Sequence, residues 1–478
     1  MRKHNLRWAK ILLPTLLFIT SLKPLSADEN PLTLLFGERQ EFSPHPAALA
    51  RVKNPGFSLS SHLDDIYREK EEWEVSSKGL TAIFQLPIKR LGAFSFKIKD
   101  EVFDLSYFEK EKELKADYNF SKRSLYLACG RKLFPFLEFG IGGERDEDGE
   151  VDWQGELLFK LSPEAELGIR FKEDNYKSKL KVDYEDETPL LLSKITSSAY
   201  QIYSPKISLS KRWSLLFDST YKRLSSGPLL EEEYSFTLTD GYKWESLAGV
   251  ICRLKEDVDL FFKIEGEELY YKGEFLHNGF EFGWLEGKKE SGFFTIGTKI
   301  RDIFLFEIKE GFFRAESKGK VSSWPFGHPI QELIGEGEIK KIKGETEIKD
   351  TKVYLGIGHL FLNKLRTQTS LSYTCLRNDG WLKLKDIKSG LSGLIEPSFY
   401  EEYPLPENFK RVHLLSPSIG LGFEFKDIKI SYSLTQVIPI LEGSDDEEGS
   451  DDEEGSDDGG KVRGGTFHLL SFNYIFDL

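Results

Sequence analysis

The stretch FHLLSFNYIFDL, residues 467–478, decides the fold of this chain. Its apolar residues recur at every second position, and a period of two places them on one face of a β-strand. In a chain that ends on such a strand, we expect lipid to cover the apolar face. The stretch therefore predicts the closing strand and assembly signal of an outer-membrane β-barrel. The alternating residues of this signal are Leu470, Phe472, Tyr474, Phe476 and Leu478.

The first 27 residues read as an export signal. Four basic residues within positions 2–10 precede the apolar run Ile11–Leu22, and Leu25-Ser26-Ala27 offers a small-residue cleavage site. This pattern predicts a secretory signal peptide over residues 1–27. The alternative is an uncleaved anchor, but a membrane-spanning helix needs about 20 apolar residues.

Composition and hydropathy seem at odds with a membrane location. The mean hydropathy is −0.38 and 30% of the 478 residues are charged, yet 37 are Phe. A barrel resolves the conflict, because only alternate residues of each strand face lipid. The net charge of −14 disfavours nucleic acid as a partner. We find no linker, so residues 56–478 are expected to form one transmembrane antiparallel all-β barrel.

Two stretches show the expected hairpins. Residues 153–161 and 165–171 alternate on either side of Ser162-Pro163-Glu164, and residues 419–425 and 428–434 alternate on either side of Lys426-Asp427. Six further short turns of this kind are expected at Lys89-Arg90, Arg131-Lys132, Lys211-Arg212, Glu256-Asp257, Arg301-Asp302 and Asn363-Lys364.

These eight turns set an upper limit of eighteen strands, and an even number is expected. Longer segments, such as 225–233 and 379–407, separate the hairpins. Short turns at one end and long loops at the other are typical of outer-membrane barrels, with the short turns in the periplasm. The main alternative fold, a soluble β-propeller, needs blade-like repeats, and we find none.

An acidic low-complexity segment occupies residues 442–460. It repeats GSDDEE and contains eleven acidic residues between Glu442 and Asp458. Such a run repels itself, so we interpret it as a solvated extracellular loop. Weak binding of divalent cations is the alternative, although the spacing does not match a calcium-binding loop. Cys129, Cys252 and Cys375 lack metal-ligand spacing, and we interpret each as a small apolar residue.

The segment Asp28–Pro55, before the first clear alternation at Phe57, is not strand-like. An open barrel of this circumference would be a wide aqueous hole. We therefore predict that residues 28–55 form an N-terminal hatch, a plug inside the lumen. No cofactor and no metal are expected.

The sequence SPHPAALARVKNPGFSLS, residues 43–60, resembles the end of the hatch in the FadL family of long-chain fatty acid and hydrocarbon channels. That family has an Asn-Pro-Ala-Gly/Ala-Leu-Ala segment shortly before its first strand, and His45 stands here in place of the Asn. The resemblance implies a fourteen-stranded barrel, a hatch that fills the lumen, and lateral release of the solute through a kinked strand. It also implies hatch or substrate residues at Phe42, His45, Pro46, Ala47 and Leu49.

An apolar solute needs an apolar groove to enter through the polar outer leaflet. We expect extracellular loop residues to line such a groove, although these residues would equally pack the loop or form an aromatic girdle. The candidates are Phe399, Tyr400, Tyr403, Leu405 and Leu414, together with Leu415.

Four functions compete. A transporter of hydrophobic small molecules such as fatty acids is our leading interpretation. The alternatives are a general porin, which the hatch argues against, and a surface adhesin that binds host or environmental ligands, with which the acidic repeat is compatible. An enzyme is disfavoured because no Gly-x-Ser-x-Gly or His-Glu-x-x-His motif is present. The expected partners of a monomer are outer-membrane lipids, the apolar solute and the barrel assembly machinery.

Overall fold

The computed structural model describes residues 45–67, 72–88, 91–109, 114–147, 149–183, 190–226, 234–277, 280–301, 303–322, 338–361, 365–388, 400–404, 411–425, 428–440 and 466–475. One short 3₁₀ helix precedes a run of strands. The elements are η2 (Ala47–Arg51), β1 (Gly56–Tyr67), β2 (Glu72–Ile88), β3 (Gly92–Glu109), β4 (Leu114–Phe134), β5 (Leu137–Asp146), β6 (Val151–Ser162), β7 (Ala165–Asp183), β8 (Leu190–Ser208), β9 (Trp213–Ser225), β10 (Tyr234–Lys255), β11 (Val258–His277), β12 (Phe280–Ile300), β13 (Phe304–Ser322), β14 (Glu338–Phe361), β15 (Leu365–Lys388), β16 (Tyr400–Pro404), β17 (Arg411–Phe425), β18 (Ile428–Gln436), β19 (Ile438–Ile440) and β20 (Thr466–Ile475).

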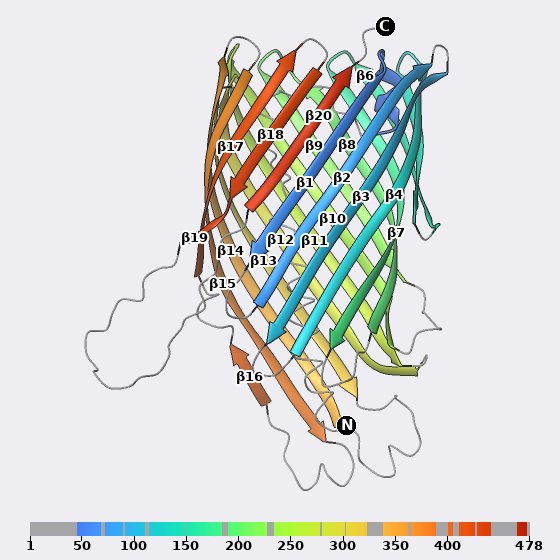
Figure 1. Cartoon of the computed structure of the whole chain (residues 1–478), viewed down its shortest axis with the longest axis vertical. Helices are drawn as coiled ribbons and strands as arrows, with labels where there is room; N and C mark the ends of the chain where they lie inside the picture. Colours follow the sequence, from blue (N-terminus) through green and yellow to red (C-terminus); the bar gives the residue numbers. More distant parts are fainter. Residues whose placement is uncertain are drawn as a thin grey trace, which may run out of the picture.

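The strands form a closed antiparallel barrel (Figure 1). Each strand from β1 to β15 pairs with the next, and the circuit continues through β17, β18 and β20 back to β1. The circuit therefore has eighteen strands. Strand β16 pairs with β15 and strand β19 with β17, so both lie beside the circuit. The closing register aligns Phe472 with Leu59 on one side and Ile430 on the other.

The two faces of the wall alternate along each strand. On β4, Leu125 and Leu127 are 39% and 57% exposed, whereas Tyr126 and Ala128 are 8% and 6% exposed. The helix η2 packs on the second pair, so the buried set faces the lumen. A strand in which one face is wide open and apolar matches a wall that meets hydrocarbon outside and a filled interior inside.

The outer surface is layered along the strands. On β12, Phe294, Ile296 and Ile300 are exposed close to the short-turn end. Farther from that end, Lys288 and Glu290 form an ion pair, and both are about half-exposed. Tyr242 stacks between Tyr221 and Tyr270, with ring centroids 6.3 and 5.7 Å apart. Apolar, aromatic and charged residues thus succeed one another, as expected for a lipid-facing band with an interfacial girdle.

At two places, strands that are not consecutive pair directly because the strands between them are shorter. The hairpin β5–β6 is short, and beyond it β4 pairs directly with β7 through Lys115–Asn119. Beyond β9, β8 and β10 pair in parallel at Leu191 and Leu192. The wall therefore contains fewer strands toward the loop end than at the short-turn end.

Seven of the eight expected turns lie between consecutive strands of the circuit, as the ends of β2, β6, β8, β10, β12, β14 and β17 show. The turn expected at Arg131-Lys132 is wrong. Strand β4 continues to Phe134, and the chain turns at Pro135-Phe136. Proline lacks the N–H that a strand interior needs, so it is the better turn residue.

Two further expectations change. The fourteen strands implied by the family resemblance are wrong, because the circuit has eighteen. The segment expected as a loop over residues 379–407 is partly strand: β15 runs to Lys388, and Tyr400–Pro404 pairs with it as β16. Strand β1 begins at Gly56, directly before Phe57.

Several expectations lie outside the described residues: the signal peptide, residues 28–44 of the expected hatch, the acidic loop, and the terminal Phe476 and Leu478. No helix within the described part of the chain is long and apolar enough to cross a membrane. Cys129, Cys252 and Cys375 are free thiols, each partly buried.

Candidate functional site: the luminal helix and its seat

The luminal helix, η2, is a single turn whose start is fixed by proline. Pro46 is the N-cap residue, and the N–H groups of Ala48 and Leu49 donate to the carbonyls of His45 and Pro46 over 3.1 and 3.2 Å. The proline φ suits the first turn of a helix, and its missing N–H costs nothing there. The turn ends at Val52, which is extended, and β1 begins soon afterwards.

Glycines of the wall let the helix backbone lie directly against the strands. A Cβ at Gly130 would overlap the carbonyl oxygen of Pro46, and a Cβ at Gly140 would overlap its carbonyl carbon. Leu49 is 1% exposed and packs with Ala93 of β3 and with Tyr126 and Ala128 of β4. The contact is therefore a fitted seat on the inner wall.

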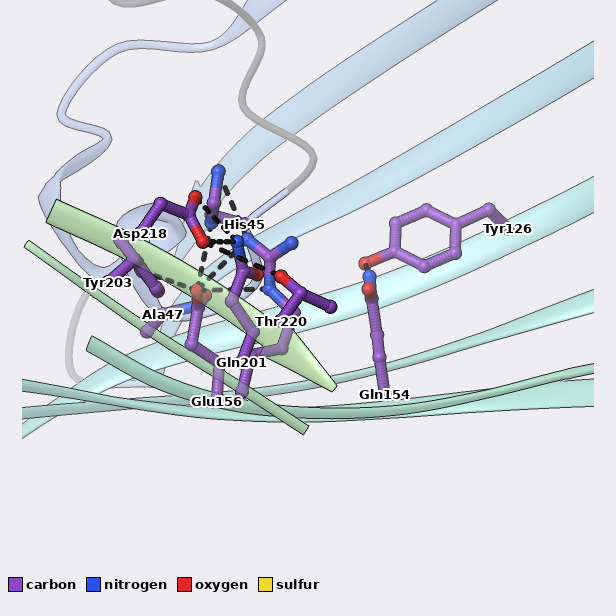
Figure 2. Close-up of polar contacts among 10 residues, drawn as sticks. His45, Ala47, Tyr126, Gln154, Glu156, Gln201, Tyr203, Asp218 and Thr220 are labelled. Atoms are coloured by element: carbon purple, nitrogen blue, oxygen red, sulfur yellow. Dashed lines mark hydrogen bonds and ion pairs between the residues drawn. The ribbon is translucent and has the colours of Figure 1, made fainter. Parts of the chain in front are cut away.

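A buried carboxylate holds the start of the helix. The side chain of Glu156, on β6, is completely buried, and its Oε2 accepts the N–H of Ala47 over 2.8 Å. Its Oε1 accepts the hydroxyl of Tyr203 over 2.5 Å. Negative charge at a helix start also meets the unpaired N–H groups there. Figure 2 shows these contacts converging on Glu156.

His45 and Arg170 complete this cluster. The Nδ1 atom of His45 lies 2.9 Å from Glu156 Oε1, and its Nε2 lies 3.0 Å from Nη2 of Arg170. A guanidinium has only donors, so Nε2 must accept and the proton must sit on Nδ1. Arg170 also donates to Glu156 over 3.2 Å. His45 is therefore neutral in this arrangement, held between an anion and a cation.

Arg51 holds the other end of the helix. Its Nε donates to Glu138 over 2.7 Å, and its two terminal nitrogens each donate to Glu166 over 3.0 Å. Burial lowers the pKa of the Arg51 guanidinium, but the hydrogen bonds to Glu166 and Glu138 outweigh it, and the pKa is raised above its usual value. The charge of Arg51 is thus permanent, and a two-pronged clamp of this kind is geometrically specific.

Polar pairs extend the cluster along the lumen. Gln201 donates to both carboxylate oxygens of Asp218 over 2.9 and 2.8 Å, and Gln154 donates to the hydroxyl of Tyr126 (Figure 2). Among the described residues, no group of three or more His, Cys, Asp or Glu side chains has the geometry of a metal site.

The opposite inner wall carries rings and lysines. On β11–β13, Phe262 and Phe294 are exposed on the outer face, so Phe261 and Phe293 face the lumen. The ring of Phe293 lies against Gly311, which has no side chain to obstruct it. Three ring–ammonium pairs follow this wall: Lys263 over Phe261 at 5.2 Å, Lys289 over Phe313 at 5.0 Å and Lys309 over Phe293 at 4.5 Å.

These lysines also form ion pairs. Lys289 contacts Glu267 over 3.1 Å, and Lys309 contacts Glu265 over 2.9 Å. In the circuit, β7–β10 separate this wall from the strands that seat the helix. A solute inside the lumen would therefore meet phenylalanine rings on this wall, with charged lysine and glutamate side chains beside them.

The structure brings together four of the expected hatch residues. His45, Pro46, Ala47 and Leu49 all contact the wall or its polar cluster, whereas Phe42 lies outside the described residues. Of the expected loop groove, Phe399 and Leu405 also lie outside them. Tyr400 and Tyr403 belong to β16. Leu414 and Leu415 lie on β17, opposite Thr374 and Tyr373, so these two belong to the barrel wall and not to a loop.

Sequence reasoning missed the residues that receive the helix: Glu156, Arg170, Tyr203, Gly130 and Gly140. Glu156 and Arg170 fall on the polar positions of the hairpin expected over residues 153–171. Charged residues are common at such positions, so the sequence does not single these two out. A glycine on an inward-facing strand position was the one available signal, since such a position often marks a close backbone approach.

No family model and no curated protein matches the chain. Several solved structures are similar to it. OccAB2 from Acinetobacter baumannii is 8% identical, with a TM-score of 0.37, over 90% of this chain and 99% of that one. A FadL homologue from Pseudomonas aeruginosa is 9% identical, with a TM-score of 0.33, over 91% and 93%. The toluene transporter TodX from P. putida is 10% identical, with a TM-score of 0.31, over 91% and 93%. At values this low, the likenesses establish nothing about what this chain binds or transports.

Proposed function

We propose that this protein is an outer-membrane channel for the uptake of hydrophobic small molecules, such as long-chain fatty acids, with the luminal helix as part of its plug. The observation that carries the proposal is the fitted seat: a helix held inside a closed barrel by glycines, by Glu156 and by the Arg51 clamp. A barrel that served only as an open pore would have no use for a segment seated in this way. The resemblance of residues 43–60 to the FadL hatch supports the same interpretation.

The inner wall of β11–β13 supports the solute class. Its phenylalanine rings offer apolar contact inside the lumen, and the lysines over them offer charge for a carboxylate head group. A long-chain carboxylate has both an apolar body and an anionic end. The loop groove at Phe399, Tyr400, Tyr403 and Leu405 remains our expectation for the first capture of the solute.

The plug is tested by deleting Asp28–Ala50 and measuring the conductance of the purified barrel in planar bilayers. We expect the variant to fold and its conductance to rise, because the helix no longer occupies the lumen. The control is the full-length chain purified in the same detergent. An unchanged conductance in a folded variant would show that the segment does not obstruct the pore.

The solute class is tested by quenching of tryptophan fluorescence with a panel of fatty acids and hydrocarbons, and by mass spectrometry of lipid that copurifies with the protein. Binding of a long-chain fatty acid supports transport. Failure of the entire panel would favour the alternative that the loops serve as an adhesin for host or environmental ligands.

A further inference from the structure

The polar cluster at the start of the luminal helix contains a histidine, His45, the residue type whose ordinary pKa lies closest to neutral pH. The ordinary pKa of a histidine side chain is about 6.5, and the His45 side chain is 32% exposed, so protons can reach it.

The bonds of His45 require the neutral ring. Its Nδ1–H donates to Glu156, and its Nε2 accepts from Arg170. Adding a proton to Nε2 creates no new bond to Glu156, because Nδ1–H is already bonded there. Protonation removes the lone pair that accepts from Arg170. The N–H groups of two cations then point toward each other, with Nε2 of His45 only 3.0 Å from Nη2 of Arg170.

We propose that His45 is a proton-operated latch, neutral when the luminal helix is seated and protonated when the start of the helix leaves its seat. The proposal rests on the proposed function, in which this helix is part of the plug. Acidification of the solution that reaches the luminal helix would then loosen the plug.

The neighbouring charges of the site fall into two groups. Nearest are the anion Glu156 and the cation Arg170, with the neutral Tyr203 ring at 5.2 Å between centroids. Farther away, the charged groups that the described residues place around the site are paired or hydrogen-bonded within the wall. These are Glu138 on β5, Glu166 on β7, Asp218 on β9 and Arg51 on the helix itself. Among the described residues, the nearest anion and cation offset each other, and the lost hydrogen bond to Arg170 sets the direction of the effect.

The direction of the pH effect follows from proton counting. The seated state binds one proton fewer than the released state, so low pH favours release. Seating is complete above pH about 6.5 and weakens as the pH falls below it. If the seated ring excludes the proton entirely, the equilibrium moves by about 30-fold between pH 7.5 and 5.0.

The experiment uses the full chain in detergent and compares it with His45→Asn. Hydrogen exchange of peptides covering residues 45–52 is measured by mass spectrometry at pH 7.5 and 5.0, after correction for the intrinsic pH dependence of amide exchange. We expect protection to fall by up to about 30-fold at pH 5.0 in the native chain and to fall much less in H45N, where only the other titratable groups of the cluster, such as Glu156, respond. Equal pH responses in the two proteins would overturn the latch.

A second variant, Arg170→Gln, keeps the test valid if H45N does not fold. Arg170→Gln still provides an N–H for Nε2 but removes the cation, so its pH response should be smaller than that of the native chain. A response of full size would also count against the latch. Bilayer conductance separates the two proposals. If the Asp28–Ala50 deletion raises the conductance but His45→Asn does not alter the pH response, the latch is refuted and the plug stands. If the deletion leaves the conductance unchanged but His45→Asn abolishes the pH response, the plug is refuted.

Discussion

The start of the luminal helix, at Pro46 and Ala47, is held by three residues of the wall. These are Gly130, Gly140 and Glu156. The glycines allow the backbone at Pro46 to touch the wall, and the carboxylate then reaches the N–H of Ala47. A larger residue at either glycine would push the helix away from the wall and lengthen that hydrogen bond. Because the carboxylate is completely buried, an N–H withdrawn from it leaves its charge poorly compensated.

We predict that Gly140→Ala unseats the helix and leaves the barrel intact, because the added methyl group meets Pro46 and not a strand. The expected result is faster hydrogen exchange over residues 45–52 and raised conductance in bilayers. Gly155→Ala is the matched control: it lies on the adjacent strand, and its Cβ would have nothing within 4 Å. Identical exchange in the two variants would contradict the close approach at Gly140.

The residues of the helix could be predicted from the sequence, but those of its seat could not. His45, Pro46, Ala47 and Leu49 form one local motif that resembles a known hatch. Glu156 and Arg170 lie more than a hundred positions farther along the chain, and only the closure of the barrel brings them to His45. Pairing over that distance depends on strand register, which local composition does not encode.

At the scale of single strands, most of the barrel could be predicted because the period of two and the short polar turns agree. The error at Arg131-Lys132 shows where this reasoning fails. A basic pair also suits a strand near the interface, and Arg131 pairs with Phe139 across the hairpin. The extension of β15 through Trp381 and Leu384 similarly shows that strands continue well beyond the apolar band.

Strand β12 offers a test of the lipid-facing band. We predict that Ile296→Arg destabilises the folded barrel by about 2–4 kcal/mol, the usual cost of an arginine near the bilayer midplane. Ile296 is half-exposed on the outer face, within the apolar part of the strand. Urea-induced unfolding in lipid vesicles, followed by tryptophan fluorescence, gives the free energy of unfolding.

The control for this experiment is Glu316→Arg, on the same outer face of the neighbouring strand but among charged side chains. There we expect a cost of at most about 1 kcal/mol, because the position lies near or beyond the interface. Equal costs at Ile296 and Glu316 would mean that the apolar band does not meet hydrocarbon.

For the whole molecule, the number of strands follows from how the circuit closes. The turn count allowed eighteen, and the structure has eighteen because β20 pairs with both β18 and β1. The fourteen strands implied by the resemblance are a property of the family, and an eighteen-residue likeness around the start of the barrel does not constrain how many hairpins follow. A circuit of eighteen strands encloses a wider lumen than one of fourteen. A helix seated in that lumen therefore has a larger effect on how much of the pore is open to solutes.

The closed wall also makes a prediction about solubility. Exposed Leu, Ile and Phe side chains surround the described barrel on its outer face, far beyond the patch that a soluble monomer tolerates. We predict that the chain without residues 1–27, the expected signal peptide, is a monomer in detergent by light scattering, and that its unboiled form migrates faster than its boiled form in electrophoresis. On removal of detergent it should aggregate, because water cannot cover that surface. A compact monomer that persisted in plain buffer would mean that the apolar face is covered by protein, and neither a lipid-facing barrel nor a channel would remain tenable.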